Sequence, residues 1–115
     1  MILVVDDDMI IARFLTDALT AESYDVCLAE DGTRAYDFLR RPDCELVLLD
    51  IEMPQINGLE LLMVMQHEKI AVPVIVMTGL HYIPEEEVRR FPNVVSFLRK
   101  PFTYRRLTSL VQDIL

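Results

Sequence analysis

The chain has 115 residues, of which 52% are hydrophobic and 26% charged, a balance that fits one globular domain and excludes a disordered chain or a second independent core. Its formal net charge of −8 would be repelled by a phosphate backbone or an anionic membrane surface, so neither nucleic acid nor a membrane is expected as a direct partner. The apolar runs are also far shorter than the roughly 20 residues of a membrane-spanning helix.

Two features of the sequence concern the compartment in which the protein works. Asp6, Asp7 and Asp8 fall where a secretory signal would need a basic start and an apolar stretch. Cys27 and Cys44 form no CxxC pair and have no nearby His, which predicts two reduced thiols and no disulfide framework or metal knuckle. We therefore expect a cytoplasmic protein.

Short β-rich runs recur along the chain. They are Ile2–Val5, Tyr24–Leu28, Leu46–Leu49, Val74–Met77 and Val94–Leu98. The first, third and fourth runs are apolar at every position, a pattern typical of strands that are covered on both faces. The sequence therefore predicts a parallel sheet that lies between two layers of helices.

Segments with a helical period lie between these runs. In the first, Asp8 is a predicted N-cap, and the apolar stripe consists of Ile11, Phe14, Leu15, Ala18 and Leu19. Further helices fit Thr33–Arg40, Leu59–Glu68, residues 83–91 and a last segment that begins at Thr103. This regular alternation of strand and helix predicts a doubly wound α/β domain with a five-stranded parallel sheet.

Chemically active side chains follow the predicted strands. Asp6 and Asp7 follow the first strand, Asp50 the third, Thr78 the fourth and Lys100 the fifth. The carboxyl ends of parallel strands meet at one edge of the sheet, where ligands bind in folds of this class. The three carboxylates would gather a local negative charge that a divalent cation offsets, and such hard oxygen ligands suit Mg²⁺.

This set of groups fits the chemistry of a phosphorylated aspartate. A cation lets an anionic phosphoryl group approach an anionic nucleophile, and Lys100 neutralises part of the remaining charge. The Thr78 hydroxyl and the Gly79 backbone N–H are available as donors to phosphoryl oxygens. The sequence thus predicts a site that forms and holds an acyl phosphate.

Four sequence motifs carry a resemblance to a known family. They are VVDDD, DIEMPQINGLEL, VIVMTG and LRKPF. With them the chain resembles the receiver domain of the response regulators of bacterial two-component systems and phosphorelays. The resemblance implies a single receiver domain over residues 1–115, with the flavodoxin-like strand order 2-1-3-4-5 that is known for such proteins.

The resemblance also implies roles for the acidic residues. Asp50 matches the phosphoacceptor of the family. Asp6 and Asp7 match the acidic pair that holds Mg²⁺, and Asp50 together with the backbone carbonyl of Glu52 completes the implied set of ligands. A sensor histidine kinase or a histidine phosphotransfer protein is the implied phosphoryl donor.

Further residues match those with which receiver domains of this family respond to phosphorylation. Thr78 and Lys100 match the hydroxyl and the ammonium that contact the phosphoryl group, and the Lys100–Pro101 peptide is implied to be cis. Phe97 matches the aromatic that moves inward when Thr78 reorients. This movement changes the face formed by the fourth helix, fifth strand and fifth helix, which would bind an effector or a second copy of the chain.

The resemblance also bears on the lifetime of the phosphorylated form. It places Glu52 and Leu80 beside the entrance to the site, where Leu80 would shield the acyl phosphate from water and the Glu52 carboxylate would hinder anionic donors. The chain would then catalyse only its own phosphorylation and dephosphorylation.

Two residues depart from the family pattern: Met9 stands where Pro is frequent, and Asn57 stands where Asp is frequent. Both fall at the starts of predicted helices, away from the residues that carry the chemistry.

Two alternatives remain open on sequence grounds. Asp6, Asp8, Thr78 and Lys100 can be placed on the pattern of haloacid dehalogenase-type phosphohydrolases, but those enzymes need a further acidic pair after the lysine. Here only Asp113 follows it. The other alternative is a receiver-like interaction domain that is never phosphorylated, although such variants are expected to lose the acceptor or the lysine.

Overall fold

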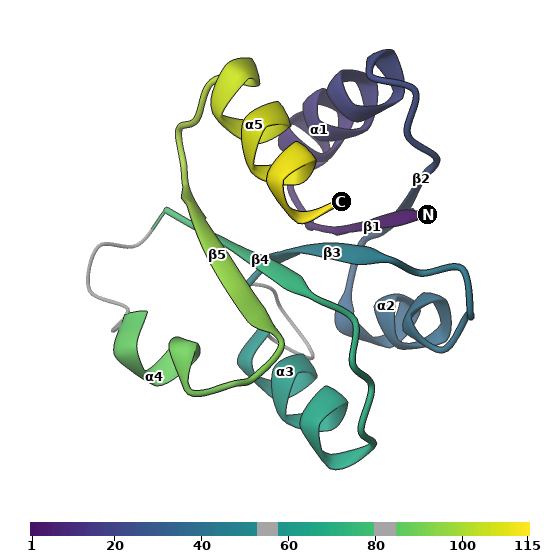
Figure 1. Ribbon diagram of the computed structural model, residues 1–115, viewed down its shortest axis with the longest axis vertical. Helices are drawn as coiled ribbons and strands as arrows, with labels where there is room; N and C mark the ends of the chain where they lie inside the picture. The colour runs from purple at the N-terminus through teal and green to yellow at the C-terminus, as the bar shows by residue number, and fades with distance from the viewer. Residues whose placement is uncertain (53–57, 80–84) are drawn as a thin grey trace.

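The computed structural model describes residues 1–52, 58–79 and 85–115. Within them a central parallel sheet lies between helices (Figure 1). The strands are β1 (Ile2–Val5), β2 (Val26–Ala29), β3 (Leu46–Asp50), β4 (Val74–Thr78) and β5 (Val94–Arg99). The helices are α1 (Met9–Ala21), α2 (Gly32–Leu39), α3 (Gly58–His67), α4 (Glu85–Arg89) and α5 (Tyr104–Ile114). In the part of the chain so described, no helix is both long and apolar enough to cross a bilayer.

The order of strands in the sheet is β2-β1-β3-β4-β5, and every neighbouring pair is parallel, which confirms the expected doubly wound fold. Strand β2 begins two residues later than the sequence pattern predicts. The reason is that Tyr24, three residues after the end of α1, still bonds to the last turn of that helix: its backbone N–H donates to the Leu19 carbonyl at 3.1 Å. Ser23, with φ of 69°, makes the turn between the two elements.

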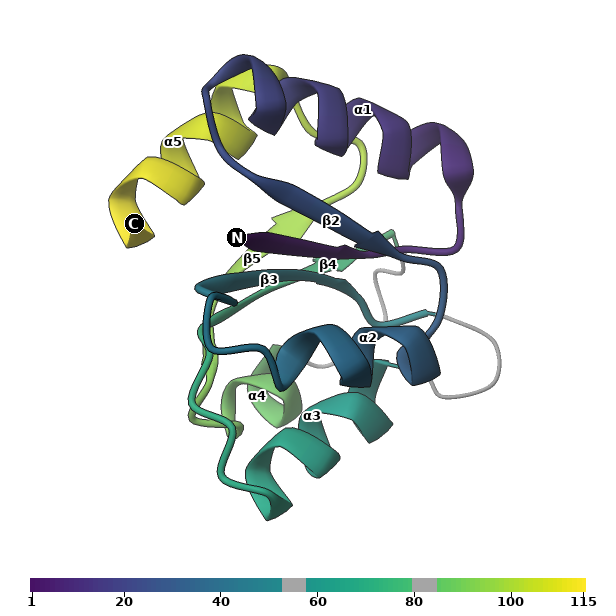
Figure 2. The same cartoon turned by 90° about the vertical axis from the view of Figure 1, so that its right-hand side faces the viewer.

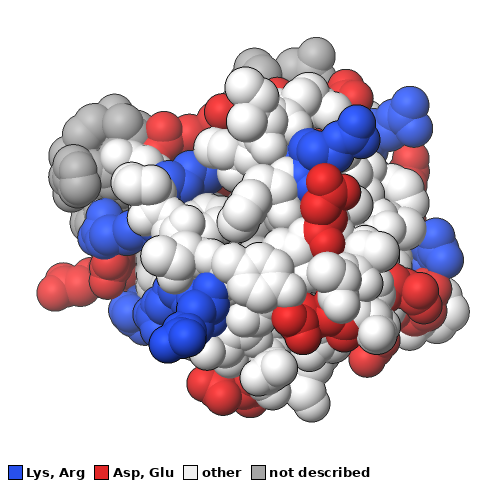
Figure 3. Space-filling model, turned by 90° about the horizontal axis from the view of Figure 1, so that it is seen from above, with Lys and Arg blue, Asp and Glu red and all other residues white. Residues whose placement is uncertain are grey.

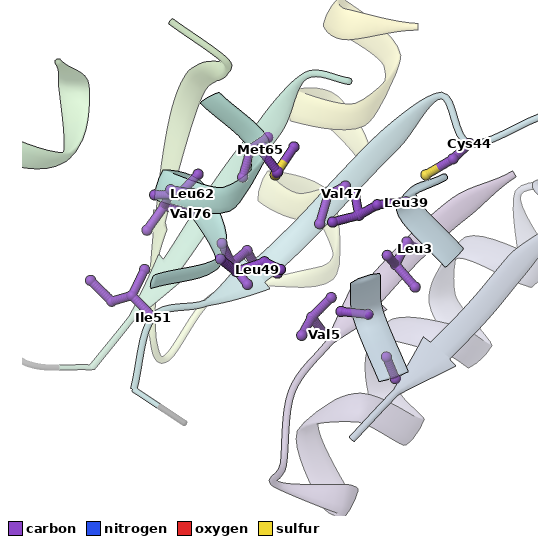
Figure 4. Packing of buried hydrophobic residues seen from close by; sticks show 14 of the residues in the cluster. Leu3, Val5, Leu39, Cys44, Val47, Leu49, Ile51, Leu62, Met65 and Val76 are labelled. Carbon is purple, nitrogen blue, oxygen red and sulfur yellow. The ribbon is translucent and has the colours of Figure 1, made fainter. Parts of the chain in front are cut away.

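The helices form two layers, one on each face of the sheet. Helices α1 and α5 cover one face, and α2, α3 and α4 cover the other (Figure 2). Alternate residues of β1 and β3 enter the two resulting cores, so that Leu3 and Val47 pack on the α2–α3 side while Ile2 and Leu46 pack on the α1–α5 side. Figure 4 shows the α2–α3 side, where Leu39 of α2 lies against strand residues. Burial on both faces explains why β1, and β3 up to Leu49, consist of apolar residues.

One residue of the predicted apolar stripe of α1 lies outside the core. Phe14 is 41% exposed, whereas Leu15 and Leu19 are fully buried. The Phe14 ring instead contacts the ring of Phe102, and their centroids lie 6.0 Å apart. The stripe is therefore narrower than predicted, because position 14 faces the β5–α5 connection and not the sheet.

Two local features position the strand ends. The Asp8 side chain accepts hydrogen bonds from the backbone N–H groups of Ile10 and Ile11, which confirms the predicted cap of α1. At the start of α3, a Cβ on Gly58 would lie 2.3 Å from the Cα of Ile51 and 2.9 Å from the Asp50 carbonyl oxygen. Only a glycine lets α3 approach the end of β3 so closely.

Candidate functional site

The ends of four neighbouring strands bring the site residues together. The register pairs Val5 with Leu49 and Asp50 with Met77, so the residues at the ends of β1, β3 and β4 lie level with one another. Asp6, Asp50 and Thr78 are 0%, 4% and 2% exposed, respectively. Three polar side chains are therefore buried together at the carboxyl ends of β1, β3 and β4.

Lys100 connects the two buried carboxylates. Its Nζ lies 3.0 Å from Oδ2 of Asp6 and 3.1 Å from Oδ2 of Asp50. The second oxygen of each carboxylate accepts a backbone N–H, from Asp8 to Asp6 Oδ1 and from Glu52 to Asp50 Oδ1, each at 2.9 Å. Both oxygens of each buried carboxylate thus have a donor, which offsets part of the cost of burying two negative charges.

The electrostatics of the site follow from this arrangement. Burial raises the pKa of Asp50 from its ordinary 3.8 to about 6, and the charge of Asp6 adds to the rise, although the Glu52 N–H and the Lys100 charge oppose it. Burial disfavours the charged form of Lys100, but its hydrogen bonds to Asp6 and Asp50 and their charges together raise the pKa of Lys100. The ammonium therefore stays charged beside a carboxylate that is costly to ionise.

A third carboxylate completes an acidic cluster. Carboxylate oxygens of Asp6, Asp7 and Asp50 all lie within 4.8 Å of one another. Asp7 is exposed, whereas Asp6 and Asp50 are buried. Oxygen donors on one side and access to water on the other fit Mg²⁺, which usually keeps several of its waters when a protein binds it. The donor set is therefore chemically suited to that ion.

Thr78 has a hydrogen-bond partner that sequence reasoning missed. Its Oγ1 donates to Oε1 of Glu52 at 2.9 Å. The expected role of Thr78 is a contact with a phosphoryl group on Asp50. Here its hydroxyl donates instead to the side chain of Glu52, which lies two residues after Asp50. Residues 52 and 78 are far apart in sequence, and only the pairing of β3 with β4 brings them together.

Phe97 is already buried in this structure, with 8% of its surface exposed. The guanidinium carbon of Arg89 lies 4.5 Å from the centroid of the Phe97 ring. Helix α4 is also held to β5 at its first residue, where Glu85 pairs with Arg99 at 2.6 Å. Sequence reasoning missed Arg89, Glu85 and Arg99, because no periodic pattern relates positions on α4 to positions on β5.

Other expected residues are placed as follows. The peptide bond between Lys100 and Pro101 is cis. Met9 begins α1 and is half exposed. Leu80 and Asn57 lie outside the described residues.

An apolar groove lies beside the site. It has a volume of about 460 Å³ and borders Lys100. Its other lining residues are Ile10, Ile11, Phe14, Pro101 and Phe102. Ile10 is 84% exposed. Figure 3 shows the face of the molecule that carries α1 and α5, where uncharged atoms occupy the centre and charged side chains surround them.

The chain matches a known family and known proteins. Residues 2–112 match the response regulator receiver domain model. The chain is 33% identical over 114 residues to the transcriptional regulatory protein GlrR of Escherichia coli (strain K12) and 31% identical over 114 residues to the response regulator MprA of Mycobacterium sp. (strain KMS). Both alignments cover 99% of this chain but only 26% of GlrR and 50% of MprA, so the chain spans a quarter to a half of these relatives.

Solved structures agree with these matches. The receiver domain of NtrX from Brucella abortus has a TM-score of 0.89 at 28% identity, and the match covers 100% of this chain and 98% of that one. The response regulator TrrA from Thermotoga maritima, solved in complex with Mg²⁺–BeF, has a TM-score of 0.87 at 31% identity, with 99% and 97% covered. These matches favour the receiver interpretation over the phosphohydrolase alternative. The chain therefore belongs to the response regulator receiver domain family, whose members are the receiver modules of two-component signalling.

Proposed function

We propose that this domain accepts a phosphoryl group on Asp50 from a phosphohistidine of a sensor histidine kinase or a histidine phosphotransfer protein. The observation that carries the proposal is the buried contact between Asp50 and Lys100. In the reaction, a carboxylate oxygen of Asp50 bonds to phosphorus as the bond from phosphorus to the donor nitrogen breaks. The donor imidazole keeps the electron pair of that bond, and Lys100 neutralises part of the negative charge that the phosphoryl group brings to the site.

The acidic cluster supports a requirement for Mg²⁺. Asp6, Asp7 and Asp50, together with the backbone carbonyl of Glu52, would hold the ion. When bound, it withdraws negative charge from the phosphoryl oxygens and so lets them approach a carboxylate. The spacing of the three carboxylates and the exposure of Asp7 support this assignment.

The apolar groove beside Lys100 is the surface on which we expect the donor to dock. A macromolecule that delivers a phosphoryl group to Asp50 has to come close to Lys100, and the groove borders Lys100 with the apolar side chains of Ile10, Phe14 and Phe102. Exposed apolar side chains next to a charged site are typical of a protein interface. The occupant we propose is the segment of the donor that carries its histidine.

The output would be read on the face formed by α4, β5 and α5. A groove of about 520 Å³ lies there and borders Phe97, Arg89 and Arg106. Phosphorylation would draw Thr78 toward the phosphoryl group and change the packing of Phe97, and an effector or a second copy of the chain would bind the altered face.

The domain would act on no substrate other than its own acceptor, catalysing its own phosphorylation and dephosphorylation. It would work in the cytoplasm, where Cys27 and Cys44, both free thiols in this structure, stay reduced. The whole chain would act as one receiver domain.

The lifetime of the acyl phosphate depends in this proposal on Leu80 and Glu52. Leu80 would exclude water from the site, so Leu80→Ala should shorten the lifetime of the phosphorylated form. The measurement is the rate of loss of phosphate from purified phosphorylated protein. An unchanged rate would show that Leu80 does not shield the site.

Mass-spectrometric mapping after treatment with acetyl phosphate and Mg²⁺ tests the proposed function. A phosphoryl group on Asp50, absent from Asp50→Asn and from protein treated with a chelator, is the expected result. A phosphoryl group on Asp6 would support the phosphohydrolase alternative. No modification at all would favour the unphosphorylated interaction domain.

A further inference from the structure

The hydrogen bond between Thr78 and Glu52 carries an inference that rests on the proposed function and deepens it. Thr78 Oγ1 donates to Glu52 Oε1 at 2.9 Å, and Thr78 is almost completely buried at the end of β4. We propose that Glu52 is a positioning residue that holds the Thr78 hydroxyl away from the acceptor and so opposes the phosphorylated state.

The first step of the argument is the donor capacity of a hydroxyl. A threonine side chain has one O–H proton, and an ionised carboxylate can only accept. While Thr78 donates this proton to Glu52, it cannot make a full hydrogen bond to an oxygen of a phosphoryl group on Asp50. The contact seen here and the contact needed for the switch therefore compete for the same proton.

The second step concerns the backbone around Glu52. Its N–H donates to Asp50 Oδ1 at 2.9 Å, so the main chain of Glu52 is fixed against the acceptor while its side chain reaches Thr78. Thr78 is fixed in turn, because its backbone carbonyl accepts from the Lys100 N–H at 2.9 Å. The side-chain hydrogen bond thus joins two backbones that are already held in place.

The third step is the effect of charge. A phosphoryl group on Asp50 adds negative charge close to the Glu52 carboxylate, and like charges at this range repel. It also supplies acceptor oxygens that compete for the Thr78 proton. Phosphorylation therefore weakens the Glu52–Thr78 hydrogen bond in two ways. The Thr78 hydroxyl can then donate to a phosphoryl oxygen. Without the Glu52 acceptor, Thr78 would adopt its activated position more readily.

The experiment is a double-mutant cycle that uses beryllofluoride with Mg²⁺ as the phosphoryl mimic. Glu52→Ala keeps the backbone N–H but removes the acceptor, and Thr78→Val removes the hydroxyl at nearly constant shape. Glu52→Ala should tighten the apparent affinity for beryllofluoride about fivefold more when Thr78 is present than in the Thr78→Val background, the equivalent of one ordinary hydrogen bond. An equal effect in both backgrounds would overturn the proposal, because a purely electrostatic role of Glu52 does not depend on the Thr78 hydroxyl.

Two further variants separate charge from hydrogen bonding. Glu52→Gln keeps an acceptor oxygen but has no charge, so its coupling to Thr78 should be smaller than that of the wild type and larger than zero. Glu86→Ala removes one negative charge from an exposed position on α4 and should leave the affinity for beryllofluoride unchanged. A gain in affinity for Glu86→Ala equal to that of Glu52→Ala would count against a specific role of Glu52.

A measurement without any phosphoryl mimic separates this proposal from the proposed function. NMR signals of the Thr78 methyl group in the unmodified protein should shift on Glu52→Ala, in the direction that beryllofluoride shifts them in the wild type. No shift would overturn the role of Glu52, even if Asp50 is phosphorylated. Conversely, if wild-type protein binds no beryllofluoride and acetyl phosphate leaves Asp50 unmodified, the proposed function fails, whatever this shift shows.

Discussion

The Lys100 ammonium lies 3.1 Å from Oδ2 of Asp50, although 50 positions separate the two residues in the chain. The same ammonium lies 3.0 Å from Asp6, so one cation serves two buried carboxylates. The side chain of Lys100 is 17% exposed, which leaves limited access of water to this contact. Lys100 therefore balances the charge of two buried carboxylates in the folded protein, in addition to its proposed contact with a phosphoryl group.

Replacement of Lys100 by methionine should destabilise the fold in a pH-dependent way. Asp6 and Asp50 would lose their cation, and removal of one partner from a buried ion pair costs about 3 kcal/mol in free energy of unfolding. The loss should be large at pH 8 and smaller at pH 4, where a protonated Asp50 needs no counter-charge. Urea unfolding at the two pH values measures this difference, with Lys69→Met, which replaces the exposed lysine of the α3–β4 connection, as the control. A loss of the same size at both pH values would contradict the explanation.

Asp50→Asn should make the fold more stable at high pH when divalent cations are absent. The pKa of Asp50 is raised from 3.8 to about 6, so the folded state prefers the protonated carboxyl, and its contribution to stability is lost as the pH rises through about 6. Asparagine has no such loss. We expect a gain of roughly 2 to 3 kcal/mol at pH 8 and little change at pH 4, measured by urea unfolding with a chelator present. A gain that does not depend on pH would show that ionisation of Asp50 is not the cause.

Gly58→Ala should disturb the acceptor through the backbone. The new Cβ would lie 2.3 Å from the Cα of Ile51, so α3 or the end of β3 has to move. We expect a loss of stability of about 2 kcal/mol and slower phosphorylation of Asp50 by acetyl phosphate. Gly79→Ala is the matched control for stability, because its Cβ would meet nothing closer than the Cβ of Lys100 at 3.9 Å. Equal stabilities of the two variants would show that the close approach at Gly58 is relieved at no cost.

Arg89→Ala should loosen the cover of Phe97. The guanidinium carbon lies 4.5 Å from the ring centroid, and a cation–π contact at a partly exposed site contributes about 0.5 to 1 kcal/mol. NMR signals of the Phe97 ring should shift in Arg89→Ala, together with a stability loss of this size. Arg90→Ala, the adjacent exposed arginine, serves as the control. Identical Phe97 signals in wild type and Arg89→Ala would mean that the arginine does not hold the ring.

Much of the fold was predictable because its signals are local. Runs of consecutive apolar residues such as Ile2–Val5 identify strands that are buried on both faces, and the Asp8 cap lies within three residues of the groups it binds. The edge where Asp6 and Asp50 meet also follows from the sequence, since residues after parallel strands share one end of the sheet. The sequence by itself therefore determined the class of fold, the order of its elements and the grouping of the acidic residues.

The tertiary structure decided which atoms are partners within that group. The Glu52 carboxylate meets the Thr78 hydroxyl, Arg89 covers Phe97, and Phe14 turns from the core toward Phe102, none of which has a periodic signal in the sequence. Each depends on strand register and side-chain direction, which are fixed only when the helices pack against the sheet. The raised pKa of Asp50 likewise arises from burial, and burial is a property of the assembled fold because it requires surfaces from distant parts of the chain to exclude water together.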